Sequence, residues 1–150
     1  HKEAALLVKQ ARDLGMKAII IGGDGWSNPE IITLGGAALE GTYFIAQTGL
    51  GDPAIGSFVA EYRSKFGQDP VMPNAALAVD GLMMLIEAIK KADGTDPVKI
   101  ARQLAALKDT QVLTGRLSID PLTNSPQNRS AVVQEIRSGQ FVYRTKIAAD

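Results

Sequence analysis

The sequence predicts an α/β fold in which a parallel sheet is flanked by helices and an antiparallel hairpin closes the C-terminal part of the chain. Three observations predict it. Short β-branched runs alternate with amphipathic segments at the start, helix-start signals precede the apolar runs in the middle, and alternating segments flank a turn near the end. The expected order is helix, strand, helix, strand, three helices and three strands.

The first 46 residues contain two expected strands, each after a helix. Apolar residues recur at three- and four-residue steps over Ala4–Leu14, which predicts a helix that Gly15 ends in a left-handed conformation. The run 17–21 lacks polar alternation, which is typical of a strand covered on both faces. Asn28-Pro29-Glu30 supplies a cap, a proline and an acid for a short helix, and a second buried strand is expected at 42–46.

The middle of the chain is predicted to be helical. Asp52-Pro53 and Asp96-Pro97 each combine a capping side chain with a proline suited to the first helical turn. The segment 75–89 between them is apolar almost all round, so we expect neighbours to bury it on several sides. Asp80 within this segment is expected to satisfy a neighbouring backbone or side-chain group.

The last third is predicted to form strands. Leu117-Ser118-Ile119 alternates as a strand does, and the segments 131–136 and 141–147 flank Ser138-Gly139 as in a hairpin. The opening helix has no strand before it to form a right-handed crossover, and three successive helices have few strands to cover them. We therefore infer that the chain is part of something larger.

Composition excludes several classes of function. The 150 residues include 16 Lys and Arg, 16 Asp and Glu, one His and no Cys. Zero net charge offers no electrostatic footprint for nucleic acid, and the lack of Cys together with a single His argues against catalytic triads and metal sites. The longest apolar stretch, 75–89, is too short to span a membrane and carries two acids. The first residues do not resemble a signal peptide, so any signal is expected to lie elsewhere.

The candidate site is the loop after the first expected strand. Gly22-Gly23-Asp24-Gly25-Trp26 stands where open α/β sheets bind ligands, at the carboxyl end of a strand. Gly23 and Gly25 would let the backbone adopt conformations closed to other residues, Asp24 would supply a charge, and Trp26 would supply a flat apolar wall. The structural alternative is that Asp24 only caps the next turn and Trp26 packs in the core.

Several segments together resemble a known family. The motif Gly22–Glu30 after an Ile-rich strand, followed by Leu39–Phe44, is similar to the C-terminal half of the branched-chain amino-acid binding proteins, the type I periplasmic substrate-binding proteins of ABC transporters. Further similar segments follow in the family's order along nearly the whole chain: Phe66-Gly67-Gln68-Asp69-Pro70, Ala75–Ala88 with Asp80, Thr114–Asp120, Ser130–Ile136 and Gly139-Gln140-Phe141.

The resemblance implies a non-catalytic protein without cofactor, whose two hinged lobes close over a small amino acid. It implies that Asp24 accepts the ligand's ammonium group and that Gln47 faces the cleft. Residues 1–46 and 119–150 would belong to the C-terminal lobe and residues 48–116 to a helical portion of the N-terminal lobe. The implied partners are an ABC permease and either the N-terminal half, absent from this sequence, or another copy of the chain. The implied location is the periplasm, or the cell exterior for a membrane-anchored lipoprotein.

Two other functions remain open from the sequence. Gly-Gly-Asp-Gly after a buried strand also resembles the phosphate-binding loop of diacylglycerol and NAD kinases, although Trp26 stands where those enzymes have Thr. Alternatively, the chain is an assembly module or non-binding fragment, because strands without neighbours and helices without a sheet favour pairing with another copy.

Overall fold

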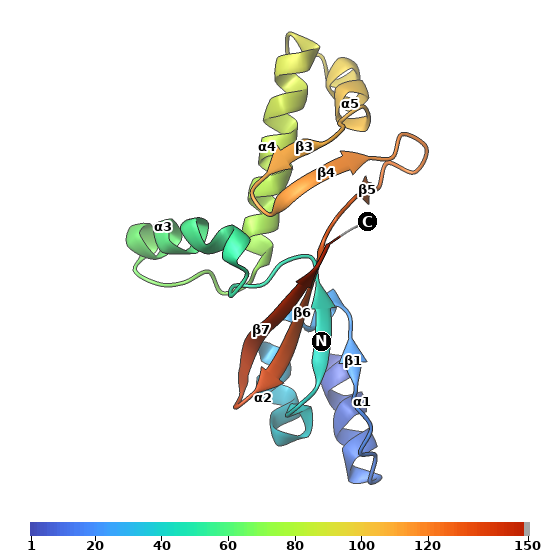
Figure 1. Ribbon diagram of the computed structural model, residues 1–150, viewed down its shortest axis with the longest axis vertical. Coiled ribbons are helices and arrows are strands. Elements are labelled where there is room, and N and C mark those ends of the chain that lie inside the picture. Colours follow the sequence, from blue (N-terminus) through green and yellow to red (C-terminus); the bar gives the residue numbers. More distant parts are fainter. Residues whose placement is uncertain (149–150) are drawn as a thin grey trace. The chain divides into compact units, whose positions relative to one another are not determined.

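The computed structural model of the chain describes residues 1–148, which divide into two compact units. Unit 1 comprises His1–Pro73 with Ala131–Ile147, and unit 2 contains Asn74–Ser130. Figure 1 shows a sheet with its helices in unit 1, and two helices with short strands in unit 2. The expected α/β class is confirmed.

The sheet of unit 1 has four strands in the order β1-β2-β6-β7. These are β1 (Ile21–Gly22), β2 (Tyr43–Ala46), β6 (Ala131–Arg137) and β7 (Gln140–Ile147). The first two strands are parallel, whereas β2 with β6 and β6 with β7 are antiparallel. The sheet is therefore mixed, and only its β1-β2 part has the parallel pairing typical of a ligand-binding edge.

Two helices cover one face of this sheet. They are α1 (Lys2–Asp13) and α2 (Glu30–Gly35), and short 3-10 turns precede and follow α2, namely η1 (Asp24–Ser27) and η2 (Gly36–Leu39). The core beneath them consists of Ala5, Val8, Trp26, Ile31, Leu39, Phe44, Ala46 and Ile136, with Phe141 packed edge-on to Phe44. Gly15 has a φ of 84°, as the helix-ending role predicted for it requires.

On the opposite face, the apolar side chains of β1 and β2 are exposed among the described residues, contrary to the expectation that both strands are buried on both sides. Ile21 is 64% exposed, and Ile19 and Ile45 are exposed as well. These side chains point away from α1 and α2, because successive residues of a strand face opposite sides. The β-branched run indicates a strand with a covering layer on each face. Among the described residues only one such layer is present, formed by α1 and α2.

The hairpin of β6 and β7 carries a turn and a bulge. Ser138 and Gly139 both have positive φ, at 52° and 68°, as a two-residue primed turn requires. Along the hairpin the pairing runs from Gln134 with Tyr143 to Val133 with Thr145, so Arg144 is an extra residue in β7. The predicted hairpin is confirmed, and the bulge determines which face the last residues of β7 present.

The segment after β2 also belongs to unit 1. It contains η3 (Pro53–Ile55), which Asp52 caps by accepting a hydrogen bond from the Ala54 N–H at 3.0 Å, and α3 (Gly56–Phe66). Helix formation after Asp52-Pro53 follows the prediction. Asp52 also pairs with Lys146 of β7, which keeps this segment in unit 1.

Unit 2 is built around one long helix. Helix α4 (Asn74–Ala92) and α5 (Pro97–Ala105) accompany the strands β3 (Thr110–Val112), β4 (Gly115–Ile119) and β5 (Pro126–Gln127). Their shared core is Leu107, Val112, Leu117 and Ile119, against which Met84 and Leu104 pack. The helix signals are confirmed, whereas β3 and β5 were missed because three- and two-residue strands leave no periodicity to detect.

Helix α4 differs from its expected burial. Four of its large apolar side chains are exposed in the described structure: Leu82, Met83, Leu85 and Ile86. Within unit 2, α5 and β3 contact α4, and they cover only part of its surface. No helix among residues 1–148 is long and apolar enough to cross a membrane.

The two units have limits that differ from the expected ones. The segment 47–73 lies in unit 1, and the segment 119–130 lies in unit 2, where Ser118 and Ile119 of β4 pair with Gln127 and Pro126 of β5. Residues 149–150 of the expected C-terminal segment lie outside the described residues. The assignment of 1–46 and 119–150 to one lobe and 48–116 to another stays a prediction.

Gly22 is required by close packing at the end of β1, and this can be tested. A Cβ placed on Gly22 would lie 2.2 Å from Cε2 of Trp26, whereas a Cβ on Gly25 would meet nothing within 4 Å. Gly22→Ala is therefore expected to lower the free energy of unfolding by about 1 to 3 kcal/mol through overpacking. Urea unfolding of the purified protein measures this, with Gly25→Ala as the control that leaves Trp26 in place. Equal stability of the two variants would contradict the packing role.

Candidate functional site

The candidate site lies at the carboxyl ends of the two parallel strands. Gly22 of β1 pairs with Phe44 of β2, and both strands run in the same direction. Asp24 follows β1 by two residues and Gln47 comes directly after β2, so both emerge at the same edge of the sheet. Both side chains are exposed. The structure thus brings together the two polar residues that were predicted from separate parts of the sequence.

The carboxylate of Asp24 is available to a ligand. It is the first residue of η1, it is exposed, and no hydrogen bond or ion pair engages its side chain among residues 1–148. The structural alternative required this carboxylate to cap the turn, but η1 has no side-chain cap. An exposed carboxylate without an internal partner can accept hydrogen bonds from a cation that approaches from solvent.

The neighbouring glycines act differently from the prediction. Gly23 and Gly25 flank Asp24 and are exposed, but neither has a positive φ, and Gly23 has the extended values −95° and −173°. The expected backbone conformations closed to other residues are therefore wrong here, because a 3-10 turn needs no left-handed residue. What the glycines provide is bare backbone on both sides of the carboxylate, since a Cβ at either position would meet nothing within 4 Å.

Trp26 is mainly a core residue. Its side chain is 9% exposed, packs on Gly22 and belongs to the cluster beneath α1 and α2. The Trp26 N–H donates to the Gly23 carbonyl at 3.1 Å, which closes the turn that carries Asp24. Trp26 therefore fixes the loop from the core side, and its role as a wall for a ligand stays a prediction.

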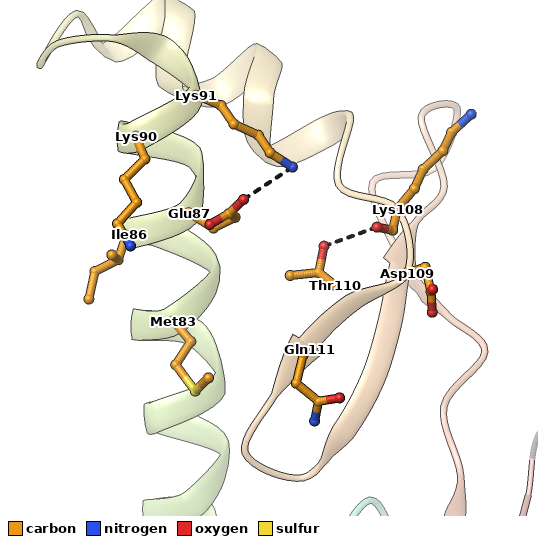
Figure 2. A pocket seen from close by; sticks show the side chains of 9 residues that line it. All are labelled: Met83, Ile86, Glu87, Lys90, Lys91, Lys108, Asp109, Thr110 and Gln111. Carbon is orange, nitrogen blue, oxygen red and sulfur yellow. Dashed lines mark hydrogen bonds and ion pairs between the residues drawn. The ribbon is translucent and has the colours of Figure 1, made fainter.

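A cavity in unit 2 holds none of the predicted site residues. It measures about 450 Å³ and lies between α4 and the start of β3, lined by Met83, Ile86, Glu87, Lys90, Lys91, Lys108, Asp109, Thr110 and Gln111. Figure 2 shows Lys91 directed at Glu87, with their charged atoms 3.3 Å apart. Hydrogen bonds from the Arg116 guanidinium lower the pKa of Asp109. Because its charges are exposed and partly paired, this groove has no buried polar group to orient a ligand.

A second cavity, of about 420 Å³, lies in unit 1. It is lined by Pro29, Ile32, Leu50, Gly51, Asp69, Val71, Pro73, Gln134, Gln140 and Phe141. Arg63 lowers the pKa of Asp69 through two hydrogen bonds, so this acid is engaged within the chain. No group of three or more potential ligands for a metal ion is present among residues 1–148.

A buried polar cluster next to Gln47 was not predicted as part of the site. Thr48 and Asp52 are buried, and Lys146 Nζ donates to Asp52 Oδ2 at 2.9 Å. The sequence identified Asp52 only as a helix cap. The two glycines at 49 and 51 are the signal that could have indicated close approach to the sheet, since a Cβ on Gly49 would lie 2.2 Å from Nε2 of Gln134.

Asp80 has the structural role that was expected for it. Its Oδ1 accepts from the Thr114 N–H at 3.0 Å and its Oδ2 accepts from Thr114 Oγ1 at 2.5 Å. Arg129 donates to the same carboxylate at 3.2 Å and to Thr114 Oγ1 at 2.9 Å. The cluster connects α4 to the turn before β4 and to the segment that leaves unit 2.

Comparison with known proteins identifies the family. A sequence profile described as periplasmic binding protein matches residues 1–140. The Leu/Ile/Val-binding protein homolog 2 of Brucella abortus (strain 2308) is 31% identical over 142 residues, which cover 93% of this chain and 37% of that protein.

Solved structures agree with the profile. A leucine binding protein from Thermotoga maritima MSB8 matches with a TM-score of 0.82 and 32% identity, over 97% of this chain and 42% of that one. A branched-chain amino acid transporter substrate binding protein from Streptococcus pneumoniae, in complex with isoleucine, matches with a TM-score of 0.78 and 27% identity, over 99% and 42%. The chain thus spans about two fifths of the length of these proteins. It belongs to the periplasmic binding protein family.

Proposed function

We propose that the chain is part of a solute-binding protein of an ABC transporter that captures a small amino acid, branched-chain or related, between two lobes. The observation that carries the proposal is the exposed, unengaged carboxylate of Asp24 at the edge where Gln47 also emerges. Family membership and the amino-acid ligands named for the relatives support it. The longer protein that contains this chain is called the parent protein below.

The proposed chemistry is recognition of a zwitterion. Asp24 accepts charge-assisted hydrogen bonds from the ligand's ammonium group, and the bare backbone of Gly23 and Gly25 lets the ligand approach closely. The Gln47 amide supplies a neutral donor and acceptor at the same edge. Trp26 holds the loop from the core and offers only its exposed margin to the ligand.

One side of the site must come from elsewhere. An exposed ion pair contributes about 0 to 1 kcal/mol, so Asp24 alone cannot hold an amino acid in water. The open sheet face with Ile21 and Ile45, and the exposed side chains of α4, are apolar surfaces that another part of the parent protein is proposed to cover. Pairing with another copy of the chain is the assembly alternative, which light scattering of the isolated chain distinguishes by its mass.

The remaining expectations follow from this proposal. The parent protein is proposed to be periplasmic, or anchored outside the cell as a lipoprotein, and to deliver its ligand to an ABC permease without catalysing a reaction or using a cofactor. The structure adds no support to the kinase-like alternative. The turn η1 is a single turn and α2 has six residues, so neither presents an extended helix terminus that could bind phosphate. Turnover of ATP by the parent protein would restore that alternative.

Calorimetric titration of the parent protein with leucine, isoleucine and valine tests the proposal. Saturable binding of at least one of them, at one site per protein, is the expected result. The isolated 150-residue chain is expected to bind weakly or not at all, because a single exposed carboxylate faces solvent. Lack of binding by the parent protein would overturn the proposal, and micromolar affinity in the isolated chain would contradict the incomplete site.

A further inference from the structure

A buried charge pair fixes the segment that follows Gln47. Asp52 is 2% exposed, and its two carboxylate oxygens have different partners. Oδ1 accepts from the Ala54 N–H at 3.0 Å, and Oδ2 accepts from Lys146 Nζ at 2.9 Å. The pair joins the segment after β2 to the end of β7, two parts of unit 1 that are 94 residues apart in the chain.

The pair lies at the edge of the sheet where Gln47 emerges. Ala46 of β2 pairs with Val132 of β6, and Val132 pairs with Lys146 of β7. These three residues form one row across the sheet, and Gln47 directly follows Ala46, the member of this row in β2. Lys146, at the β7 end of the row, binds Asp52 and thereby holds the loop that begins at Gln47.

The backbone between Gln47 and Asp52 has little room to move. The Asp52 N–H donates to the Gly49 carbonyl at 2.8 Å, and the buried Thr48 Oγ1 lies 3.5 Å from Asp52 Oδ2. Gly49 packs on the Gln134 side chain, and a Cβ on Gly51 would lie 2.9 Å from Cβ of Tyr143. The loop 48–52 thus packs closely against side chains of β6 and β7, and the hydrogen bonds of Asp52 fix its end.

Helix capping alone does not account for a buried pair. Asp96 caps α5 with two backbone hydrogen bonds, at 2.8 and 3.1 Å, while exposed and without an ion-pair partner among the described residues. Asp52 instead has a buried carboxylate paired with a lysine whose side chain is 24% exposed, and this burial costs desolvation. Because that cost offsets much of the attraction between the charges, the pair is weak evidence for added stability, and a fixed loop geometry is the contribution tested below.

We propose that Asp52 and Lys146 are positioning residues of the ligand site, which hold Gln47 at the carboxyl end of β2 in the orientation that meets the ligand. This inference rests on the proposed function. Neither residue touches the ligand. They act through the Thr48–Asp52 loop, so their removal changes the position of Gln47. The affinity for the amino acid then falls by no more than the contribution that Gln47 makes to binding.

The test is a double-mutant cycle in the full-length parent protein. Calorimetry measures the dissociation constant for leucine or isoleucine, whichever the wild-type protein binds, and thermal unfolding is recorded for each variant. Lys146→Met removes the ammonium and keeps the side-chain length, and we expect it to weaken binding by about tenfold. In a Gln47→Ala background the same substitution is expected to change the affinity by less than about twofold, because the group it positions is gone.

Two further variants control for folding and charge. Lys146→Arg keeps the cation and is expected to restore affinity to within about threefold of the wild type. Asp69→Asn breaks the exposed pair with Arg63 in the same unit and is expected to leave the affinity unchanged. If Lys146→Met lowers the unfolding temperature but not the affinity, or weakens binding equally in both backgrounds, the positioning role is overturned and the proposed function stands. If the wild-type parent protein binds no amino acid, both are overturned.

Discussion

Replacement of Asp24 by alanine in the parent protein is expected to weaken amino-acid binding by about 2 to 5 kcal/mol, the range for removing one partner of a buried, hydrogen-bonded charge pair. The pair is buried only in the liganded state, because in this chain the carboxylate is exposed and has no partner among the described residues. Thermal unfolding without ligand should therefore be unaffected by the substitution. Loss of affinity with unchanged stability is the signature of a ligand-contacting residue.

Calorimetry against leucine, isoleucine and valine measures this effect, with Glu61→Ala as the matched control. Glu61 is an exposed acid of the same unit on α3, so its removal changes net charge equally without touching the predicted site. Asp24→Asn is an informative intermediate, because an amide oxygen still accepts a hydrogen bond but carries no charge. Affinity equal to wild type in Asp24→Ala would remove Asp24 from the site.

Asp80→Ala is expected to lower the free energy of unfolding by about 3 to 5 kcal/mol, the cost of breaking a buried ion pair. Asp80 is 4% exposed, and its carboxylate accepts from Thr114 and Arg129. Alanine retains the helix at this position of α4 but leaves Arg129, whose side chain is 17% exposed, without its carboxylate. Unit 2 therefore loses the connection between α4 and the turn before β4.

Urea unfolding of the parent protein measures this loss, and Asp109→Asn serves as control. Asp109 pairs with Arg116 on the surface of the same unit, where solvent screens the pair, and asparagine tolerates the positive φ of 44° at this position, so the substitution should leave the unfolding midpoint unchanged. A midpoint for Asp80→Ala indistinguishable from that of Asp109→Asn would show that the buried cluster does not stabilise unit 2.

The local signals in the sequence predicted those elements whose causes are local. The capping roles of Asp52 and Asp96 and the turn at Ser138-Gly139 all act within four residues, and each is found as expected. The short strand β3 was missed because three residues carry no periodicity. Helix boundaries and turn chemistry are thus available from sequence where a capping side chain or a positive φ enforces them.

The features that depend on distant partners could not be predicted. The apolar run at 17–21 indicated two covering layers, yet Ile19 and Ile21 are exposed because this chain provides only one. Asp24 and Gln47 were each identified in sequence, but their shared edge follows from the parallel pairing of β1 and β2. The pairing of Asp52 with Lys146 joins residues 94 positions apart, and no pattern in either segment indicates the other.

The bulge at Arg144 makes the length of β7 part of the site. If β7 kept the same residues but had no bulge, Thr145 rather than Lys146 would stand opposite Val132, and the lysine would face the other side of the sheet. Homologues that differ in side chains along β7 can therefore keep the pair with Asp52, and one that lacks a residue between Gly139 and Lys146 keeps its lysine opposite Val132 only where the bulge is absent as well.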